Sequence, residues 1–508
     1  MSKPSRRLNR EAIKEQRREK KKQEKALRKR QQAEGLVPRT PPALPNRCSP
    51  HTTPEEEQQE REDAVTGQLR ILRRELPKLL QRLEKIPDPR QPRKSKHKLT
   101  MLMIYGLLMF VFQIGSRRQA NKIMTRPQFM ANLQLFFPEL ERIPHADTLY
   151  RLLCNIDVEQ LEQAHTERVR RLIRGKKFRR FLINGCYPIA FDGSQKFTLD
   201  LQWDENPLER THGQEDNSHT QYYVYVLEAS LCFHNGMVIP LLSEFLEYAK
   251  GDTDHDKQDC EQRAFHRLSV RIKQLFPHLP ILGLLDGLFA NGPVMDRCQQ
   301  LNWQFMIVLK DKGPSNIWEE YDGLQPLQPR NRLIRSWGAR RQSFSWSNTI
   351  EYEYRQGGKR QWITLHVVVC KETWETVGKQ GEILPQSSRH AWISSRPLNH
   401  NNVHERCNLG ARYRWGIEAG FLVEKHQGYH YEHIFALNWN AMKGYHCLMR
   451  MAHLFNTLAR FSKHLKALYA RYGVRDTIAF IRESCAAPWL DPVRIKTLLS
   501  QPFLLKLE

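Results

Sequence analysis

YPIAFDGS, residues 187–194, decides the fold: a mostly apolar run leads into a carboxylate, Asp192, and then into a glycine. This pattern is typical of a buried strand that ends by delivering an acidic side chain to the edge of a sheet. PILGLLDG, residues 280–287, repeats the pattern with Asp286. A single Asp-Gly between apolar runs is also common in hairpin turns. Two such stretches predict adjacent strands that present both carboxylates to one metal site.

The segments around these stretches predict a mixed sheet covered by helices, which is an α/β fold. Asn235-Gly236 joins two β-rich runs and is a strong hairpin signal. Phe265, Leu268 and Ile272 recur on one face and predict a helix before the second aspartate. A further helix and a strand follow that aspartate. The expected elements cover residues 222–233, 237–245, 257–276, 293–300 and 305–309.

The chain is strongly basic, which favours a polyanionic partner. Its 508 residues contain 80 Lys and Arg against 55 Asp and Glu, a net charge of +25, with a pI of about 9.7. A basic and well-solvated surface is the simplest explanation. An excess of this size favours nucleic acid as the partner.

The cysteines and the N-terminus favour a reducing compartment. The ten cysteines include no Cys-x-x-Cys pair, so neither a zinc site nor a disulfide framework is indicated. The first thirty residues are charged and lack the apolar core of a signal peptide. The most hydrophobic run, residues 99–114, is short for a membrane span, and we expect it to form a buried helix. A cytoplasmic protein without a membrane partner is expected.

Composition divides the chain into segments. Residues 1–40 carry fifteen Lys and Arg and five Glu without an apolar stripe, which predicts a disordered tail or a single solvated helix that attracts phosphates. Helices with basic faces then suggest a DNA-binding region, although a packing role is equally compatible with them. The expected segments are a disordered basic tail and linker (1–55), a helical DNA-binding region (56–175), the first part of the core (180–312), a β-rich insertion (313–400), the helical second part of the core (401–466) and a C-terminal helical tail (467–508).

A third acidic residue would complete a metal site, because divalent cations prefer several hard oxygen ligands. The candidate is Glu418. Arg414, Glu418 and Lys425 have the spacing i, i+4 and i+11 and would lie on one helical face. Such a face is either a solvated, salt-bridged surface or a surface that binds phosphates. Apolar neighbours such as Phe421 predict a largely buried helix and favour phosphate binding.

In this order, Asp192, Asp286 and Glu418 resemble the catalytic triad of bacterial insertion-sequence DDE transposases, whose catalytic core has a ribonuclease-H-like fold. Arg414, Glu418 and Lys425 are similar to the Tyr-x2-Arg-x3-Glu-x6-Lys signature of one large group, although Ala411 occupies the position of the signature Tyr. A β-rich insertion between the second Asp and the Glu, and a helical region before the core, also resemble that group. The resemblance covers roughly residues 85–460.

The resemblance implies a DNA transposase that cleaves DNA at the ends of an insertion sequence and transfers the strands into target DNA. Two Mg²⁺ ions, which Mn²⁺ can replace, would be held by Asp192, Asp286 and Glu418. The same resemblance implies that Arg414 and Lys425 bind the DNA, and Arg412 is a further candidate. The expected assembly is a homodimer on element ends and target, at the bacterial nucleoid in the cytoplasm.

Two alternatives stay open at the level of sequence. The first is a metal-dependent nuclease of the same fold that cuts DNA without strand transfer. The second is a noncatalytic nucleic-acid-binding protein in which the three acids are structural. Substitution of Asp192 by Ala separates the second alternative from the transposase, because only an enzyme would lose metal-dependent cleavage while DNA binding survives.

Overall fold

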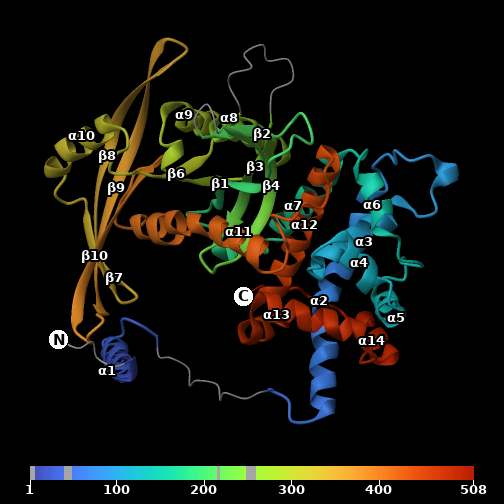
Figure 1. Ribbon diagram of the computed structural model, residues 1–508. Coiled ribbons are helices and arrows are strands. Elements are labelled where there is room, and N and C mark those ends of the chain that lie inside the picture. The colour runs from blue at the N-terminus through green and yellow to red at the C-terminus, as the bar shows by residue number, and fades with distance from the viewer. Residues whose placement is uncertain (1–5, 39–48, 214–217, 248–258, 508) are drawn as a thin grey trace. The chain divides into compact units, whose positions relative to one another are not determined.

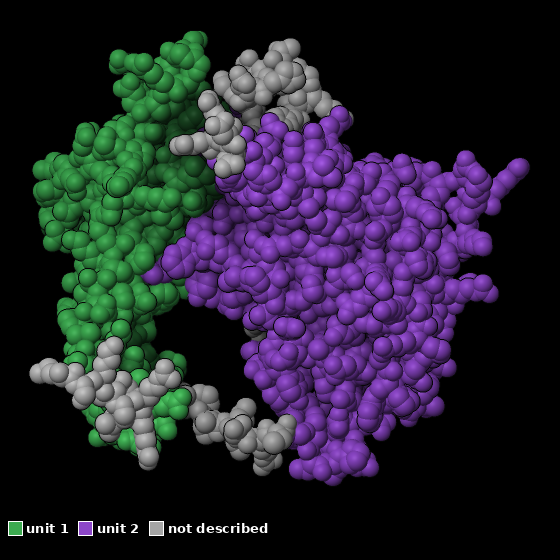
Figure 2. Space-filling view, in the orientation of Figure 1, with its two compact units in different colours: residues 1–48, 285–411 green, residues 49–284, 412–508 purple. Residues whose placement is uncertain are grey.

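The computed structural model describes residues 6–38, 49–213, 218–247 and 259–507. The chain forms two compact units, shown in Figure 2. Residues 1–48 and 285–411 make up the first unit, and residues 49–284 and 412–508 make up the second. Helices and strands occur in both (Figure 1). The fold is therefore mixed α/β, and each unit combines segments that are distant in the sequence.

A mixed sheet forms the β part of the second unit. Strand β1 (Tyr187–Leu199) pairs antiparallel with β3 (His219–Cys232) and parallel with β5 (Ile281–Leu285). On its other side, β3 pairs with β2 (Leu208–His212) and β4 (Val238–Leu246). The predicted mixed sheet and its hairpin are confirmed, whereas the short strand β2 was not predicted.

The prediction that the first strand ends at Asp192 is wrong. Strand β1 continues to Leu199, because its second half pairs with β3 beyond a register shift between Gln195 and Phe197. Asp192 therefore lies inside the strand, directly opposite Glu228 of β3. The Asp-Gly pair is part of the strand and makes no turn.

Helix α12 (Trp439–Arg460) connects the sheet of the second unit with its helical part. It is buried along most of its length and contacts β4, α3 (Leu99–Val111) and α7 (Val158–Arg174).

The predicted buried helix over residues 99–114 is confirmed by α3. Helix α8 (Glu261–Leu275) packs on β3 and β4 and confirms the predicted helix, whose residues 257 and 258 lie outside the described residues. The other helices of this unit are α2 (Pro54–Leu83), α4 (Arg117–Met124), α5 (Pro127–Phe136), α6 (Ala146–Leu153), α11 (Gly416–His426), α13 (Lys466–Ala486) and α14 (Pro492–Ser500).

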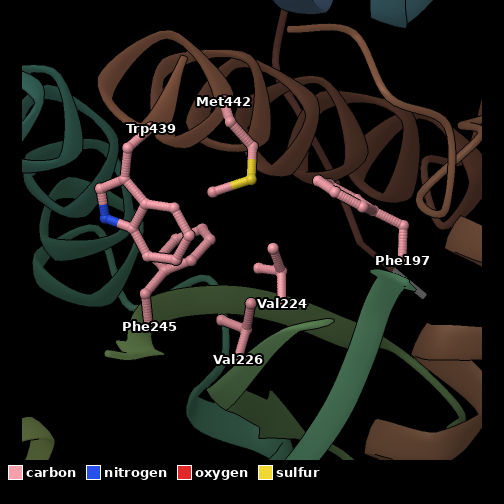
Figure 3. Close-up of a cluster of buried hydrophobic side chains, with 6 residues drawn as sticks. All are labelled: Phe197, Val224, Val226, Phe245, Trp439 and Met442. Carbon is pink, nitrogen blue, oxygen red and sulfur yellow. The ribbon is translucent and has the colours of Figure 1, made fainter. Parts of the chain in front are cut away.

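An apolar cluster fixes the start of α12 on the sheet. Strands β1, β3 and β4 contribute one face of this cluster, and α12 contributes the other, as Figure 3 shows. Removal of these side chains from water stabilises the contact by roughly 1.5–3 kcal/mol for each large residue. The cluster consists of Phe197, Val224, Val226, Phe245, Trp439 and Met442.

The first unit contains an antiparallel sheet in the order β6-β10-β9-β8-β7. Strands β8 and β9 form a long hairpin (Figure 1) whose turn contains Gly357 and Gly358, both with positive φ. Strands β7 to β10 lie within residues 313–400, the segment predicted to be rich in β structure. Helix α9 and strand β6 confirm the elements predicted after Asp286. The bounds are β6 (Gln304–Val308), β7 (Arg332–Trp337), β8 (Arg340–Gln356), β9 (Lys359–Val377), β10 (Ile383–Ser394), α9 (Gly292–Gln300) and α10 (Ser315–Leu324).

The basic N-terminal segment forms a helix, α1 (Arg6–Ala33). Of the two alternatives expected from its composition, a disordered tail or one solvated helix, the structure contains the helix. Arg30 near its end forms an ion pair with Glu375 of β9. Helices elsewhere in the described residues are likewise short or polar, and none has the length and apolarity that a bilayer crossing requires.

Candidate active site

Asp192 is the central residue of the candidate site. Its side chain is 23% exposed, and its Oδ1 accepts a hydrogen bond of 3.1 Å from the backbone N–H of Gly193. A Cβ on residue 193 would lie 2.4 Å from Cε1 of Tyr225. Only glycine allows the strand to approach the tyrosine ring this closely. Tyr225 in turn donates a hydrogen bond of 2.7 Å to Glu261, at the start of α8.

Arg414 links Asp192 to Glu418. Its Nη1 lies 3.7 Å from Oδ2 of Asp192, and its Nη2 donates a hydrogen bond of 2.7 Å to Oε1 of Glu418. The guanidinium is 9% exposed, and its Nε has no hydrogen-bond partner among the described residues. Arg414 and Glu418 were expected on one helical face, and the structure shows them in direct contact. One arginine thus brings two of the three predicted acids together.

The prediction that Arg414, Glu418 and Lys425 share one continuous α-helix is wrong. Residues 411–415 form a 3₁₀ helix, and α11 begins at Gly416. Glu418 therefore lies in the first turn of α11, where the helix dipole stabilises a negative charge. Across this change of helix type, Nη2 of Arg414 still donates its hydrogen bond to Glu418.

Two glycines allow α11 to lie close to the sheet. A Cβ on Gly416 would be 3.3 Å from Cβ of Cys232, and one on Gly420 would be 3.3 Å from Cγ1 of Val238. Both contacts are tighter than ordinary van der Waals packing. The small residues on this face place Glu418, which is 49% exposed, near the end of β3.

The surroundings of Asp192 raise the pKa of its carboxyl group to about 6. Burial is the largest cause, and the nearby carboxylates of Glu418 and Glu261 act in the same direction, whereas Arg414 and the N–H of Gly193 oppose them. A carboxylate that is partly desolvated and faces further carboxylates has an incompletely compensated negative charge. Such a group is typical of sites that bind a cation or exchange a proton.

Asp286 lies in the first unit, immediately after β5. Its Oδ1 accepts a hydrogen bond of 2.9 Å from the N–H of Leu288, and its Oδ2 lies 3.9 Å from Nζ of Lys310. In the parallel ladder of β1 and β5, Ala190 is the partner of Leu284. Asp192 and Asp286 each follow this pair by two residues. The prediction that the two strands are adjacent is therefore confirmed.

The two other predicted DNA-binding residues lie at opposite ends of the α11 segment. Arg412 is partly buried in the 3₁₀ helix. Lys425 is in the last turn of α11, and its Nζ lies 3.1 Å from Oε1 of Glu432. Among the ion pairs of the described residues, Lys425 pairs with Glu432, whereas Glu418 pairs with Arg414. Ala411, at the position of the signature Tyr, is buried.

Sequence reasoning missed Glu261 and Tyr225 as neighbours of Asp192. Both contacts are made by residues more than thirty positions away in the chain, so no local spacing indicates them. In the sequence, Tyr225 belongs to an alternating β run and Glu261 lies near the start of a predicted helix. These signals predict secondary structure but not a contact with Asp192.

The donor atoms of the site suit a hard divalent cation in kind, because they are carboxylate oxygens. Across the described parts of the chain, no group of three or more His, Cys, Asp or Glu side chains is gathered closely enough to hold a metal ion. The structure thus brings together Asp192, Arg414 and Glu418, while Asp286 is described with Lys310 in the other unit.

Comparison with known proteins gives one match to a family. Residues 80–167 match the family model described as DDE_Tnp_1-associated. The matched segment begins in α2 and ends in α7, so it covers most of the helical region that precedes β1. No curated protein matches the chain. The family match indicates a transposase-related role for this chain.

Proposed function

We propose that this protein is a DDE transposase with a ribonuclease-H-like catalytic core, which cleaves DNA at the ends of its element and joins the strands to target DNA. The observation that supports this proposal most is the pair of carboxylates, Asp192 and Glu418, held by Arg414. The transposase-associated region that precedes the core supports it independently. The Tyr-Arg-Glu-Lys signature group, or a close relative of it, is the proposed subgroup.

Asp192, Asp286 and Glu418 are the proposed ligands of two Mg²⁺ ions, which Mn²⁺ can replace. The register of β1 and β5 supports Asp286 as the third ligand. When bound, such ions lower the pKa of an attacking oxygen and stabilise the leaving oxygen in phosphodiester chemistry. The raised pKa of Asp192 supports the assignment, because a nearby cation would compensate the charge that Arg414 leaves uncompensated.

Arg414, Lys425 and Arg412 are the proposed contacts to DNA phosphates. A guanidinium forms strong charge-assisted hydrogen bonds with phosphate oxygens, and Nε of Arg414 has no partner among the described residues. The net charge of +25 supports a polyanionic partner. We further propose a homodimer that holds two element ends and works at the nucleoid in the cytoplasm, since strand transfer involves two ends.

Cleavage of DNA that carries the element's own ends tests the proposal, with purified protein and Mg²⁺. We expect Glu418→Gln to abolish cleavage and to retain end binding. Glu483→Gln is the matched control, because Glu483 is an exposed residue of α13 in the same unit. Its cleavage rate should equal that of the wild type.

Each other result selects an alternative. Cleavage without joined products in the wild type would indicate a nuclease. End binding without cleavage by folded wild-type protein would favour the noncatalytic binding protein. Full activity of Glu418→Gln would exclude Glu418 as the third acid.

A further inference from the structure

The interior of the second unit contains a buried charge cluster formed by Glu228 of β3, Glu424 of α11, and His446, Arg450 and His453 of α12. Each of these side chains is no more than 6% exposed. Burial of charges is costly unless each is paired and hydrogen-bonded. Their arrangement therefore needs an explanation in terms of what they hold in place.

Arg450 is the centre of this buried charge cluster. Its Nη1 donates a hydrogen bond of 3.0 Å to Oε1 of Glu424, and its Nη2 lies 3.2 Å from Oε2 of Glu228. The same Nη2 donates a hydrogen bond of 3.1 Å to the hydroxyl of Ser230. A planar guanidinium with fixed donor directions determines the relative positions of the groups it binds.

Histidines on both sides of Arg450 reinforce the two carboxylates. Nδ1 of His453 lies 2.6 Å from Oε1 of Glu424, and Nε2 of His446 lies 3.0 Å from Oε1 of Glu228. The three α12 residues are spaced four and three positions apart, which places them on one helical face. This face continues the apolar stripe of Trp439 and Met442 that packs on the sheet (Figure 3).

Each carboxylate of the buried charge cluster shares a secondary-structure element, or a strand pairing, with an acid of the candidate active site. Glu228 is the cross-strand partner of Asp192. Glu424 lies on the same helix as Glu418, six residues further on. One guanidinium is therefore fixed to the strand beside Asp192 and to the helix that presents Glu418.

The contacts of α11 with the sheet are mainly packing contacts. Gly416 and Gly420 lie close to Cys232 and Val238, and Ile417 and Phe421 are buried, so this packing sets how near the helix lies to the sheet. Hydrogen bonds to a buried carboxylate are directional. The bonds from Arg450 and His453 to Glu424 therefore add a directional restraint on the rotation and axial position of α11.

We propose that Arg450 is a positioning residue that fixes Glu418 relative to Asp192 by holding Glu424 of α11 and Glu228 of β3 at once. The claim that this placement matters for catalysis rests on the proposed function. Because Arg450 is only 5% exposed, it would act through these two carboxylates and not on DNA directly. Buried ion pairs can often be replaced by apolar residues without loss of stability, so a role in placement explains the buried charge cluster better than stability alone.

Two variants and a control test the proposal. Glu424→Gln keeps the shape of the side chain and removes its charge, and Arg450→Lys keeps a positive charge and removes the planar fork. Arg460→Lys is the matched control, because Arg460 is an exposed residue at the end of the same helix. All four proteins are compared as full-length chains.

The first measurement is backbone hydrogen exchange without added metal. We expect the amides of α11 to exchange about tenfold faster in Glu424→Gln and in Arg450→Lys, because each variant weakens a charge-assisted hydrogen bond that holds the helix. The amides of α13 should be unchanged, and Arg460→Lys should match the wild type. Equal acceleration throughout the unit in both variants, or no acceleration in α11, would overturn the proposal.

The second measurement is the affinity for Mn²⁺, followed by electron paramagnetic resonance. Glu424→Gln should weaken binding about tenfold, for the same reason, and should add nothing in a chain that already carries Glu418→Gln. Wild-type binding that depends on Glu418 but is unaffected by Glu424→Gln would overturn the positioning role. Wild-type protein without any Glu418-dependent binding would instead overturn the proposed function, and the exchange measurement then decides the placement of α11.

Discussion

The second unit contains two clusters in which one arginine lies between two carboxylates, and the pKa shifts in the two clusters have opposite directions. At the candidate active site, the pKa of Asp192 is raised to about 6. In the buried charge cluster, burial acts to raise the pKa of Glu424, but Arg450 and then His453 lower it to about 2. Burial alone therefore does not decide the direction of the shift.

The difference lies in how the donors are distributed. Glu424 receives close contacts from two groups, at 3.0 Å from Arg450 and 2.6 Å from His453. Asp192 lies 3.7 Å from Arg414, whose closer contact of 2.7 Å goes to Glu418. A buried carboxylate whose charge is fully paired with hydrogen-bond donors is held in a fixed position. A carboxylate whose charge is only partly paired can still bind a cation.

The largest effect is expected from removal of the central arginine of the buried charge cluster. Arg450→Met leaves Glu228 and Glu424 buried without their main partner, and we expect the free energy of unfolding to fall by about 3–5 kcal/mol. Arg471→Met, which breaks the surface pair with Glu60, should cost less than about 1 kcal/mol. Urea denaturation measures both, and equal small losses would remove the contrast between the clusters.

The pH dependence of stability should have opposite signs in the two clusters. The pKa of Asp192 is about 6 in the folded chain and about 3.9 when unfolded, so its ionisation destabilises the fold as pH rises from about 4 to 6. Asp192→Asn should therefore stabilise the protein at pH 7 by about 2–3 kcal/mol and have little effect at pH 4.

Glu424 provides the control of opposite sign for this measurement. Its pKa is about 2 in the folded chain and about 4.3 when unfolded, so its ionisation stabilises the fold above the unfolded value, and this is lost as pH falls toward 2. Glu424→Gln should destabilise the protein at pH 7, with a difference that narrows below about pH 4. Thermal unfolding across pH distinguishes the two, and shifts of the same sign would contradict the comparison.

An intermediate effect is expected at Gly193, where the strand of the candidate site meets Tyr225. A Cβ at this position would lie 2.4 Å from the ring, so Gly193→Ala should cost about 1–3 kcal/mol through overpacking. Gly323→Ala in α10 is the control, because the space around that helical glycine is open and alanine should stabilise it by about 0.5–1 kcal/mol. Tolerance of Gly193→Ala would show that Asp192 needs no such close packing.

The smallest effect on stability is expected at Lys425, whose partner Glu432 is 54% exposed. Lys425→Gln should change stability by less than about 1 kcal/mol, while DNA binding weakens and the slope of log affinity against log salt falls by about one. Fluorescence anisotropy at several salt concentrations measures this. An unchanged slope would exclude a phosphate contact.

Local patterns in the sequence predicted the elements and one half of the site. The alternating runs, Asn235-Gly236 and the apolar helix over residues 99–114 are signals within short windows, and the structure contains each of them. The spacing of Arg414 and Glu418 predicted a shared helical face, and in the structure the two side chains form a hydrogen bond.

The other half of the site and the buried charge cluster could not be predicted, because they are formed by residues that are distant in the sequence. Asp192 lies within its strand because β3 extends the ladder beyond it, and the sequence around Asp192 does not contain that partner. Arg450 meets Ser230 across 220 positions and Glu424 across 26. Within its own window, Arg450 is one of several polar residues of α12, and nothing there marks it as the centre of a cluster.

The single face shared by the apolar cluster and the buried charge cluster restricts the length of α12. One residue inserted between Met442 and His446 would turn everything after it by about 100° and direct Arg450 away from both glutamates, while Trp439 and Met442 stayed on the sheet. Deletion of one residue would do the same in the opposite sense. Homologous chains are therefore expected to vary in the loops around α12 but to keep the number of residues between positions 439 and 453 unchanged.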